Sequence, residues 1–536
     1  MQVELVLLVL SLLFFASIFT DKIGYKFGVP ALLMFLAVGM IFGPDGIGAL
    51  FNDDGVGYML KTETAEALSA IALCIILFSG GMDTKLTDIR PVLAPGVTLA
   101  TAGVLITAVV TGFILFYVFG WLNSFESVTL SMSLLIAATM SSTDSASVFS
   151  ILRTNGIGIK HNLRPLLELE SGANDPMAYV LTTTLIGVVT AKTAVSGLEI
   201  VQTIVIQLVM GTVIGFFFGK GLVELMRRVK LSNESLYPIM VLTACIFIFS
   251  VTYFMKGNAY LAVYVGGLII GNSKFTRKHQ TKSFFDGLTW LAQLSMFLML
   301  GLMVRPHELL NWHVLFAGLI ISVVMVCISR PLAVYLCMVP FRQYTHKDKL
   351  FLSWVGLKGA VPIIFAVMSK AEGVAHADLL FNIIFLCTIV SLLTQGTSLS
   401  SMAKRLQVAT EPVKLKKLVH FDIELPEEIQ SSATEIEVTW DMVADGNHLR
   451  EINLPPQTLV IMVRRGEDFF VPTGQSELAE GDQLLVLTDN DIEVANRYKE
   501  EEQAEEQRLP TREMIANTRA YILRAWKKIS ENKKKI

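Results

Sequence analysis

The sequence predicts an all-α polytopic membrane protein: about 13 transmembrane helices in two inverted six-helix repeats with broken crossing helices, followed by a small cytoplasmic α/β domain. Three observations indicate this fold class. The 536 residues are 53% hydrophobic and 17% charged with a mean hydropathy of +0.56, whereas soluble domains are nearer a quarter charged. Apolar segments of spanning length recur up to residue 404. Beyond that point the composition becomes that of a soluble domain.

The membrane spans follow from segment length, because a helix needs roughly 20 apolar residues to cross about 30 Å of hydrocarbon. The candidate spans, numbered 1 to 13 in chain order, lie near residues 3–20, 28–43, 64–82, 92–120, 127–151, 164–190, 199–226, 235–255, 259–273, 287–304, 313–339, 350–370 and 379–403. Spans 1–6 and 8–13 form two six-helix units, and the odd span 7 inverts the second unit. Span 5 then corresponds to span 12.

The loops between these spans predict the orientation. Alternate loops are rich in Lys and Arg, beginning with Lys22 and Lys26, whereas each intervening loop holds one basic residue or none. The positive-inside rule therefore places the N-terminus outside and the C-terminal region in the cytoplasm. An odd number of spans requires the same arrangement. We expect a multi-pass membrane protein.

The chain divides into four parts by composition. Residues 1–404 form the transmembrane domain, and residues 405–432 are a mixed, charged linker. Residues 433–492 alternate like strands and contain turn signals, which is typical of a small soluble domain. Residues 493–536 are charged and compatible with a helical tail, whose lysine-rich end is a solvated segment or a contact with anionic lipid.

Several function classes are excluded by bulk properties. A net charge of -3 gives no basic field for nucleic acid. The five cysteines lie in hydrophobic stretches and match neither a disulfide framework nor a zinc site. No phosphate loop, HExxH motif or nucleophile–base pair is evident, so we expect no enzyme activity and no cofactor.

Span 6 carries the most informative polar residues. Glu170 and Asn174 are four residues apart, as are Ser171 and Asp175, so each pair shares a helix face. Ionisable side chains inside a span are costly and indicate function. Oxygens of these types replace part of the hydration shell of a monovalent cation, K+ or Na+, at Asp175, where a proton competes for the same carboxylate. The alternative is a structural patch that holds helices together, but Pro176 also loosens the helix here.

Spans 5 and 12 are each predicted to be interrupted. Span 5 contains a run of Ser, Thr and Asp that includes Thr143 and Asp144, and span 12 contains Gly356, Lys358 and Pro362. Irregular backbone at membrane depth is tolerated where it lines a cavity, and paired broken helices are typical of inverted-repeat transporters. Asp144 and Lys358 would balance the dipoles of the half-helices. Ordinary kinks without function are the alternative.

Span 11 places Arg330 in mid-membrane, where a guanidinium must be paired. Glu170 is the best partner within the membrane. We expect a structural ion pair that holds span 6 in place.

Four motifs together carry a family resemblance: ESGAND from Glu170, STD from Ser142, SRPL around Arg330, and GLKGAVP from Gly356. With them, spans 1–13 resemble the NhaP/NHE branch of the cation–proton antiporters. The resemblance implies a homodimer in which a core moves like an elevator against a dimerisation domain. It also implies that Asp175 binds the cation or the proton, with help from Thr143, Asp144 and Ser171. Glu170 is implied to pair with Arg330. An Asn–Asp pair at this position is associated in the family with electroneutral exchange.

Two departures from this family pattern are visible. Span 3 reads LFSGGM, with Ser79 where the family often has glutamate, so an accessory carboxylate is missing there. Lys358 stands where many relatives carry arginine, which leaves the role of this residue open.

Residues 433–492 are similar to the RCK-C (TrkA-C) domain, which senses small ligands and tends to dimerise. A small-molecule regulatory ligand is therefore expected there. This pairing of domains looks like the bacterial K+/H+ antiporters linked to cell-volume regulation, and the preference for K+ over Na+ depends on it.

Other classes of membrane protein remain alternatives at this stage. RCK modules also gate potassium channels, and GVGYM (Gly55 to Met59) invites comparison with a channel filter, but it lacks the filter's threonine and final glycine. A sodium-coupled symporter for an organic solute also uses broken helices, although spans 5, 6 and 12 show no pocket for a large anion. Na+/H+ exchange is the nearest alternative to K+/H+ exchange.

Overall fold

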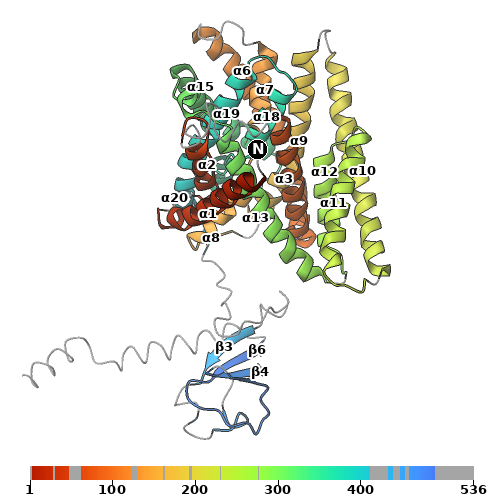
Figure 1. The fold of residues 1–536 in the computed structure, drawn as a ribbon, viewed down its shortest axis with the longest axis vertical. Coiled ribbons are helices and arrows are strands. Elements are labelled where there is room, and N and C mark those ends of the chain that lie inside the picture. The colour runs from red at the N-terminus through yellow and green to blue at the C-terminus, as the bar shows by residue number, and fades with distance from the viewer. Residues whose placement is uncertain are drawn as a thin grey trace, which may run out of the picture. The chain divides into compact units, whose positions relative to one another are not determined.

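A computed structural model describes residues 3–27, 30–46, 62–122, 129–160, 163–191, 196–229, 231–275, 277–410, 433–438, 443, 447–452, 458–466 and 468–488. The chain forms two compact units, Met1–Pro412 and Val413–Ile536 (Figure 1). Each unit is described separately.

The first unit is helical. Its elements are α1 Val3–Phe27, α2 Ala31–Phe42, α3 Thr62–Asp83, α4 Leu86–Ile89, η3 Arg90–Val92, α5 Leu93–Thr98, η4 Leu99–Gly103, α6 Val104–Leu122, α7 Leu130–Thr139, α8 Ser145–Thr154, β1 Gly158–Ile159, α9 Leu163–Thr190, α10 Gly197–Arg228, α11 Leu236–Phe254, α12 Ala259–Gly271, α13 Lys278–Leu302, α14 Pro306–Leu309, α15 Trp312–Val324, η5 Met325–Ser329, α16 Arg330–Cys337, α17 His346–Trp354, α18 Val361–Ala371, α19 Ala377–Ser391, η6 Leu392–Gly396, α20 Thr397–Arg405 and β2 Ala409–Thr410. η3 is a 3₁₀ turn, and η4, η5 and η6 are π-helical turns.

Seven helices in the described part of the chain are long and apolar enough to cross a membrane: Thr62–Asp83, Leu86–Gly120, Gly197–Arg228, Leu236–Phe254, Lys278–Leu302, Trp312–Cys337 and Ala377–Arg405. Shorter apolar helices occupy several other expected spans, and α9 is long but carries the polar residues of span 6. The helical membrane fold is confirmed, whereas 13 spans and the inverted repeat stay predictions.

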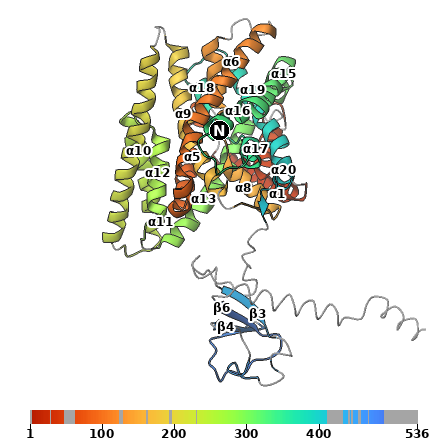
Figure 2. The same cartoon turned by 180° about the vertical axis from the view of Figure 1, so that it is seen from behind.

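The helices of the first unit pack as two groups. We call α1–α3 with α10–α13 the panel, because each packs on others of this set, and α4–α9 with α14–α20 the core. The panel helices α10, α11 and α12 stand side by side on the right in Figure 1 and on the left in Figure 2. The two groups meet where α3 packs on α18 and α9 packs on α12. A shared cluster of buried apolar side chains, including Phe78 of α3 and Phe365 of α18, joins them.

Small residues allow the closest helix contacts in the panel. A Cβ atom added to Gly267 of α12 would lie 2.2 Å from the carbonyl oxygen of Phe78, and one added to Gly271 would lie 2.1 Å from that of Met82. Glycine at these positions therefore lets α3 and α12 approach backbone to backbone, which is how membrane helices gain packing without a hydrophobic driving force.

The second unit contains an antiparallel sheet in the order β3-β6-β4-β5, built from β3 Ala433–Glu437, β4 Thr458–Arg465, β5 Asp468–Phe470 and β6 Gln483–Thr488. Its inner face is lined by alternate residues such as Ile436, Val463 and Leu484. The strands expected in residues 433–492 are therefore present. The helices of the predicted α/β domain and the tail 493–536 lie outside the described residues.

The chain remains packed on the first unit past residue 404, the predicted end of the transmembrane domain. After α20 it continues into β2, which pairs with β1, and Val408 is fully buried. The first unit extends to Pro412. A strand of two residues leaves too short a pattern to be recognised in a charged sequence, and the linker bounds 405–432 stay a prediction.

Candidate ion site

The first helix break lies between α7 and α8, at residues 140–144. The run Ser141, Ser142, Thr143 and Asp144 breaks the helix because short polar side chains compete for backbone hydrogen bonds. Asp144 then caps α8: Oδ1 accepts from the Ser147 amide at 3.0 Å and Oδ2 from the Ser147 hydroxyl at 2.5 Å. The carboxylate therefore lies at the positive end of a half-helix, as the sequence predicts.

The second break lies between α17 and α18, and it touches the first. The Asp144 amide donates to the carbonyl of Leu357 at 2.8 Å, and Lys358 Nζ donates to the carbonyl of Ser142 at 2.9 Å. A Cβ atom added to Gly359 would lie 2.6 Å from Asp144 Oδ2. Lys358 is buried and stabilises the carbonyl end that the first break exposes.

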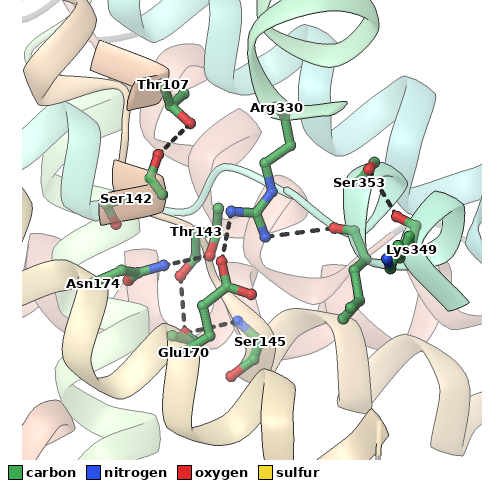
Figure 3. A network of polar contacts seen from close by, with 12 residues as sticks. Thr107, Ser142, Thr143, Ser145, Glu170, Asn174, Arg330, Lys349 and Ser353 are labelled. Atoms are coloured by element: carbon green, nitrogen blue, oxygen red, sulfur yellow. Dashed lines mark hydrogen bonds and ion pairs between the residues drawn. The ribbon is translucent and has the colours of Figure 1, made fainter. Parts of the chain in front are cut away.

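Helix α9 supplies the third side of the site. The Ser142 hydroxyl donates to Asp175 Oδ1, and Asn174 Nδ2 donates to Thr143 Oγ1 at 2.5 Å. The Ser171 hydroxyl donates to the Thr143 carbonyl at 2.8 Å and accepts from the Ser145 amide at 3.1 Å. The polar face of α9 thus lies on the irregular segment of the first break (Figure 3).

An ion pair supports this arrangement from the other side. Arg330 Nη1 lies 2.5 Å from Glu170 Oε1, with both side chains almost fully buried, and Arg330 Nη2 donates to the Leu352 carbonyl at 3.4 Å. Figure 3 shows the guanidinium between α9 and the helix that leads to the second break. The expected pairing of Glu170 with Arg330 is confirmed. It connects α9, α16 and α17.

A side chain of the panel forms a hydrogen bond next to the site. Asn258 caps α12 by accepting from the Leu261 amide at 3.0 Å, and its Nδ2 donates at 2.7 Å to the carbonyl of Pro176, next to Asp175. Asn258 is fully buried. A movement of the core against the panel would therefore change a hydrogen bond next to Asp175.

The oxygens around Asp175 suit a dehydrated monovalent cation. The Asp175 carboxylate is 8% exposed, and Ser142 and Thr143 are buried beside it. Asn174 Oδ1 is buried without a hydrogen-bond partner in the part of the chain that the structure describes. A carboxylate, hydroxyls and an amide oxygen are hard ligands of the kind that replace the water around alkali cations.

Comparison with known proteins agrees with this geometry. The transmembrane sodium/hydrogen exchanger family matches residues 8–405, and the TrkA-C domain matches residues 433–497. The chain belongs to the sodium/hydrogen exchanger family. It is therefore a multi-pass membrane protein of a transporter family, with a TrkA-C domain after the exchanger domain.

Named exchangers from other organisms are similar over most of the chain. The K(+)/H(+) antiporter NhaP of Alkalimonas amylolytica is 42% identical over 408 residues, 76% of this chain and 67% of that protein. The K(+)/H(+) antiporter NhaP2 of Shewanella sp. (strain ANA-3) is 36% identical over 482 residues, 89% of this chain and 80% of that protein. The sodium proton antiporter MjNhaP1 from Methanocaldococcus jannaschii shares the fold, with a TM-score of 0.64 at 22% identity over 76% of this chain and 99% of that one.

For this exchanger, the structure brings together the eight residues singled out from the sequence, but the contacts of Ser171 differ from the expectation and Ser142 joins the group. Ser171 was expected to act with Asp175, whereas its hydroxyl holds the backbone of Thr143 and Ser145. Ser142 takes the place beside Asp175 instead. The STD motif contained Ser142, but sequence spacing does not reveal which hydroxyl of an extended strand faces a neighbouring helix. Asn258 carried no signal at all, because its partner is a backbone carbonyl.

Proposed function

We propose that this protein is a secondary active K+/H+ antiporter in which a cation and a proton compete for Asp175. The observation that carries the proposal is the position of this carboxylate. It is buried where two interrupted helices meet, and it is hydrogen-bonded to a hydroxyl of the first break. Such a group exchanges a proton for a cation as alternating access exposes it to either side.

The charges at the two breaks favour electroneutral exchange. Asp144, Glu170 and Asp175 are acidic residues, and Arg330 and Lys358 are basic residues. With all five ionised, the group carries one excess negative charge. Either one monovalent cation or one proton neutralises that charge, so the loaded site would have the same charge in both transport states.

The proposal of K+ rather than Na+ as the transported cation rests on the names of similar proteins. Proteins named K(+)/H(+) antiporters match this chain at 35–42% identity. A protein named Na(+)/H(+) antiporter, from Halobacillus dabanensis, matches at 28% over 52% of this chain. Because carboxylate, amide and hydroxyl oxygens serve either ion, Na+/H+ exchange is the alternative that flux measurements separate.

The finer architecture is part of the same proposal. The α7–α8 and α17–α18 breaks correspond in the predicted inverted repeat of 13 spans, and the π turns η4 and η5 lie in the spans just before them. Paired irregularities support two inverted units.

We further propose a homodimer in the bacterial inner membrane, with the N-terminus outside and the C-terminal domain in the cytoplasm. We also propose that a small regulatory ligand binds the TrkA-C domain.

Proteoliposome flux tests the proposed function. We expect proton movement driven by K+, compared with Na+ and Rb+ across pH, and we expect Asp175→Asn to abolish it in a folded, inserted protein. Glu168→Gln is the matched control on α9, since in the described part of the chain Glu168 forms a partly exposed ion pair with Arg164. Full exchange in Asp175→Asn at normal expression would remove Asp175 from the site, and passive K+ flux without protons would indicate a channel.

A further inference from the structure

The chain that leaves the first unit toward the C-terminal domain is attached to the loop between α8 and α9. β2 pairs antiparallel with β1, in the register Gly158 with Thr410 and Ile159 with Ala409. The Lys160 amide adds a hydrogen bond to the Val408 carbonyl at 3.1 Å. We call residues 157–160 together with 408–410 the exit ladder.

Both strands of the exit ladder begin at a helix end of the same design. Gly156, with φ of 62°, ends α8, and the Ile157 amide donates to the Leu152 carbonyl. Gln407, with φ of 57°, ends α20, and the Val408 amide donates to the Ala403 carbonyl. Left-handed residues at these two positions turn each chain sharply off its helix. Each strand of the exit ladder therefore follows directly from the capped end of a helix.

The exit ladder is also anchored by a buried side chain. Val408 is fully buried in an apolar cluster that contains Leu152 of α8, Phe351 of α17 and Leu357 of the second break. The same cluster contains residues of the first turns of α9. A displacement of β2 would thus disturb elements on both sides of the ion site.

Polar contacts tie the exit ladder to the helix before the second break. Lys347 of α17 donates to the Gln407 side chain, and Lys160 Nζ lies 4.0 Å from Asp348 Oδ1. Asp348 is the capping-box residue of α17, with Thr345 as the N-cap. Gln407 on one side and Lys160 on the other therefore connect the two chains of the exit ladder to α17, the helix that leads into the second break.

We propose that the exit ladder couples the C-terminal domain to the ion site, so that a pull on the chain after Pro412 changes the geometry at Asp144 and Asp175. This inference names the regulation of the site in the proposed function and rests on that function. α8 is a short rigid helix with the ladder at one end and the Asp144 cap at the other. α9 leads from the same loop to Asp175. Because the ladder has few hydrogen bonds, the free energy of binding a ligand is enough to open or close it.

The test uses the full-length protein in proteoliposomes. Lys160→Pro removes the amide that donates to Val408, whereas Lys160→Ala removes only the side chain and is the matched control. A second change inserts about ten Gly and Ser residues after Pro412, which slackens the connection without removing the domain. We expect Lys160→Pro and the slack insertion each to change the half-saturating K+ concentration by about fivefold or more, and the combination to give no further change. Lys160→Ala keeps the amide bond to Val408 and loses only the side chain's 4.0 Å contact with Asp348, so it should shift the half-saturating concentration clearly less than Lys160→Pro.

A cross-link keeps the test decisive if Lys160→Pro folds poorly. Ile159→Cys with Ala409→Cys places two thiols at paired positions, and copper phenanthroline as oxidant closes them into a disulfide. With the ladder locked, the slack insertion should have no effect, and reductant should restore its effect. An unchanged response to the insertion in the locked protein, or no response in the unlocked protein, would overturn the coupling. Absence of cation-driven proton flux in the unaltered protein would instead overturn the proposed function.

Discussion

At the residue scale, the polar side chains of the site divide into two sets. One set forms hydrogen bonds with backbone groups that have no helical partner at the breaks; it consists of Ser171, Asp144 and Lys358. Asp175 accepts from the Ser142 hydroxyl and Asn174 donates to Thr143, while Asn174 Oδ1 is buried without a partner among the described residues. Buried polar groups need partners, so the first set makes the irregular backbone tolerable in a membrane, and the second set supports the proposed ion site.

The Glu170–Arg330 pair gives a prediction about stability. Arg330→Met leaves the Glu170 carboxylate buried at 1% exposure without its partner, which costs roughly 3–5 kcal/mol. Thermal unfolding in detergent should show a clearly lower Tm, and Glu170→Gln combined with Arg330→Met should recover much of the loss. Arg164→Met is the control, because an exposed pair contributes about 1 kcal/mol or less. Equal Tm values for Arg330→Met and Arg164→Met would contradict the structural role.

At the element scale, the two interrupted helices depend on each other. Each break leaves helix ends without partners, and the other break supplies them through Asp144, Leu357 and Lys358. The panel adds the Asn258 contact beside Asp175. The sequence predicted both interruptions from Ser, Thr, Gly and Pro content, because these residues act on the backbone locally.

Gly359 tests the contact between the breaks. In Gly359→Ala the new methyl group would lie 2.6 Å from Asp144 Oδ2 and 2.9 Å from its Cβ, so the cap of α8 must shift. We expect K+-driven proton flux to fall at least about tenfold, since small misplacements at a site are costly. Gly187→Ala on α9 is the control, because nothing lies within 4 Å of its added Cβ and alanine favours the helix. Normal flux in Gly359→Ala would show that the close approach is unnecessary.

At the scale of the whole molecule, the two units are stabilised by different chemistry. The membrane unit packs apolar helices around a few paired charges, whereas the C-terminal sheet is closed by an exposed arginine on a buried aspartate. Arg465 donates to Asp482 from Nε at 2.9 Å and from Nη2 at 2.7 Å, and the Ala479 amide adds a third bond. Asp482 directly precedes β6, so these bonds connect β4 to the turn before β6.

The pH dependence of the C-terminal domain follows from this pair. Burial raises the pKa of Asp482, but the hydrogen bonds from Arg465 and Ala479 outweigh it and hold the pKa below its usual value of 3.8. The stabilisation is therefore present above the unfolded pKa, about 3.9, and is lost as pH falls through the lower folded value. Hydrogen exchange of residues 458–488 in the full chain, corrected for intrinsic rates, should accelerate in that acid range.

Asp482→Asn should accelerate the same exchange at neutral pH and remove its acid dependence. Glu480→Gln, an exposed neighbour, is the control and should leave both unchanged. Unaltered protection in Asp482→Asn would mean that the ion pair contributes little to the sheet.

The sequence by itself predicted the membrane class, both helix interruptions and the Glu170–Arg330 pair, and it singled out Asp175 as the proposed centre of the site. These follow from hydrophobicity, local backbone preference and the cost of burying charge, all of which act on a residue wherever the chain folds. Only the tertiary structure decided that Ser142 rather than Ser171 faces Asp175, that Asn258 of the panel contacts Pro176, and that residues 408–410 belong to the membrane unit. Each depends on the register at which distant segments cross, and that register is set by the packing of the whole unit.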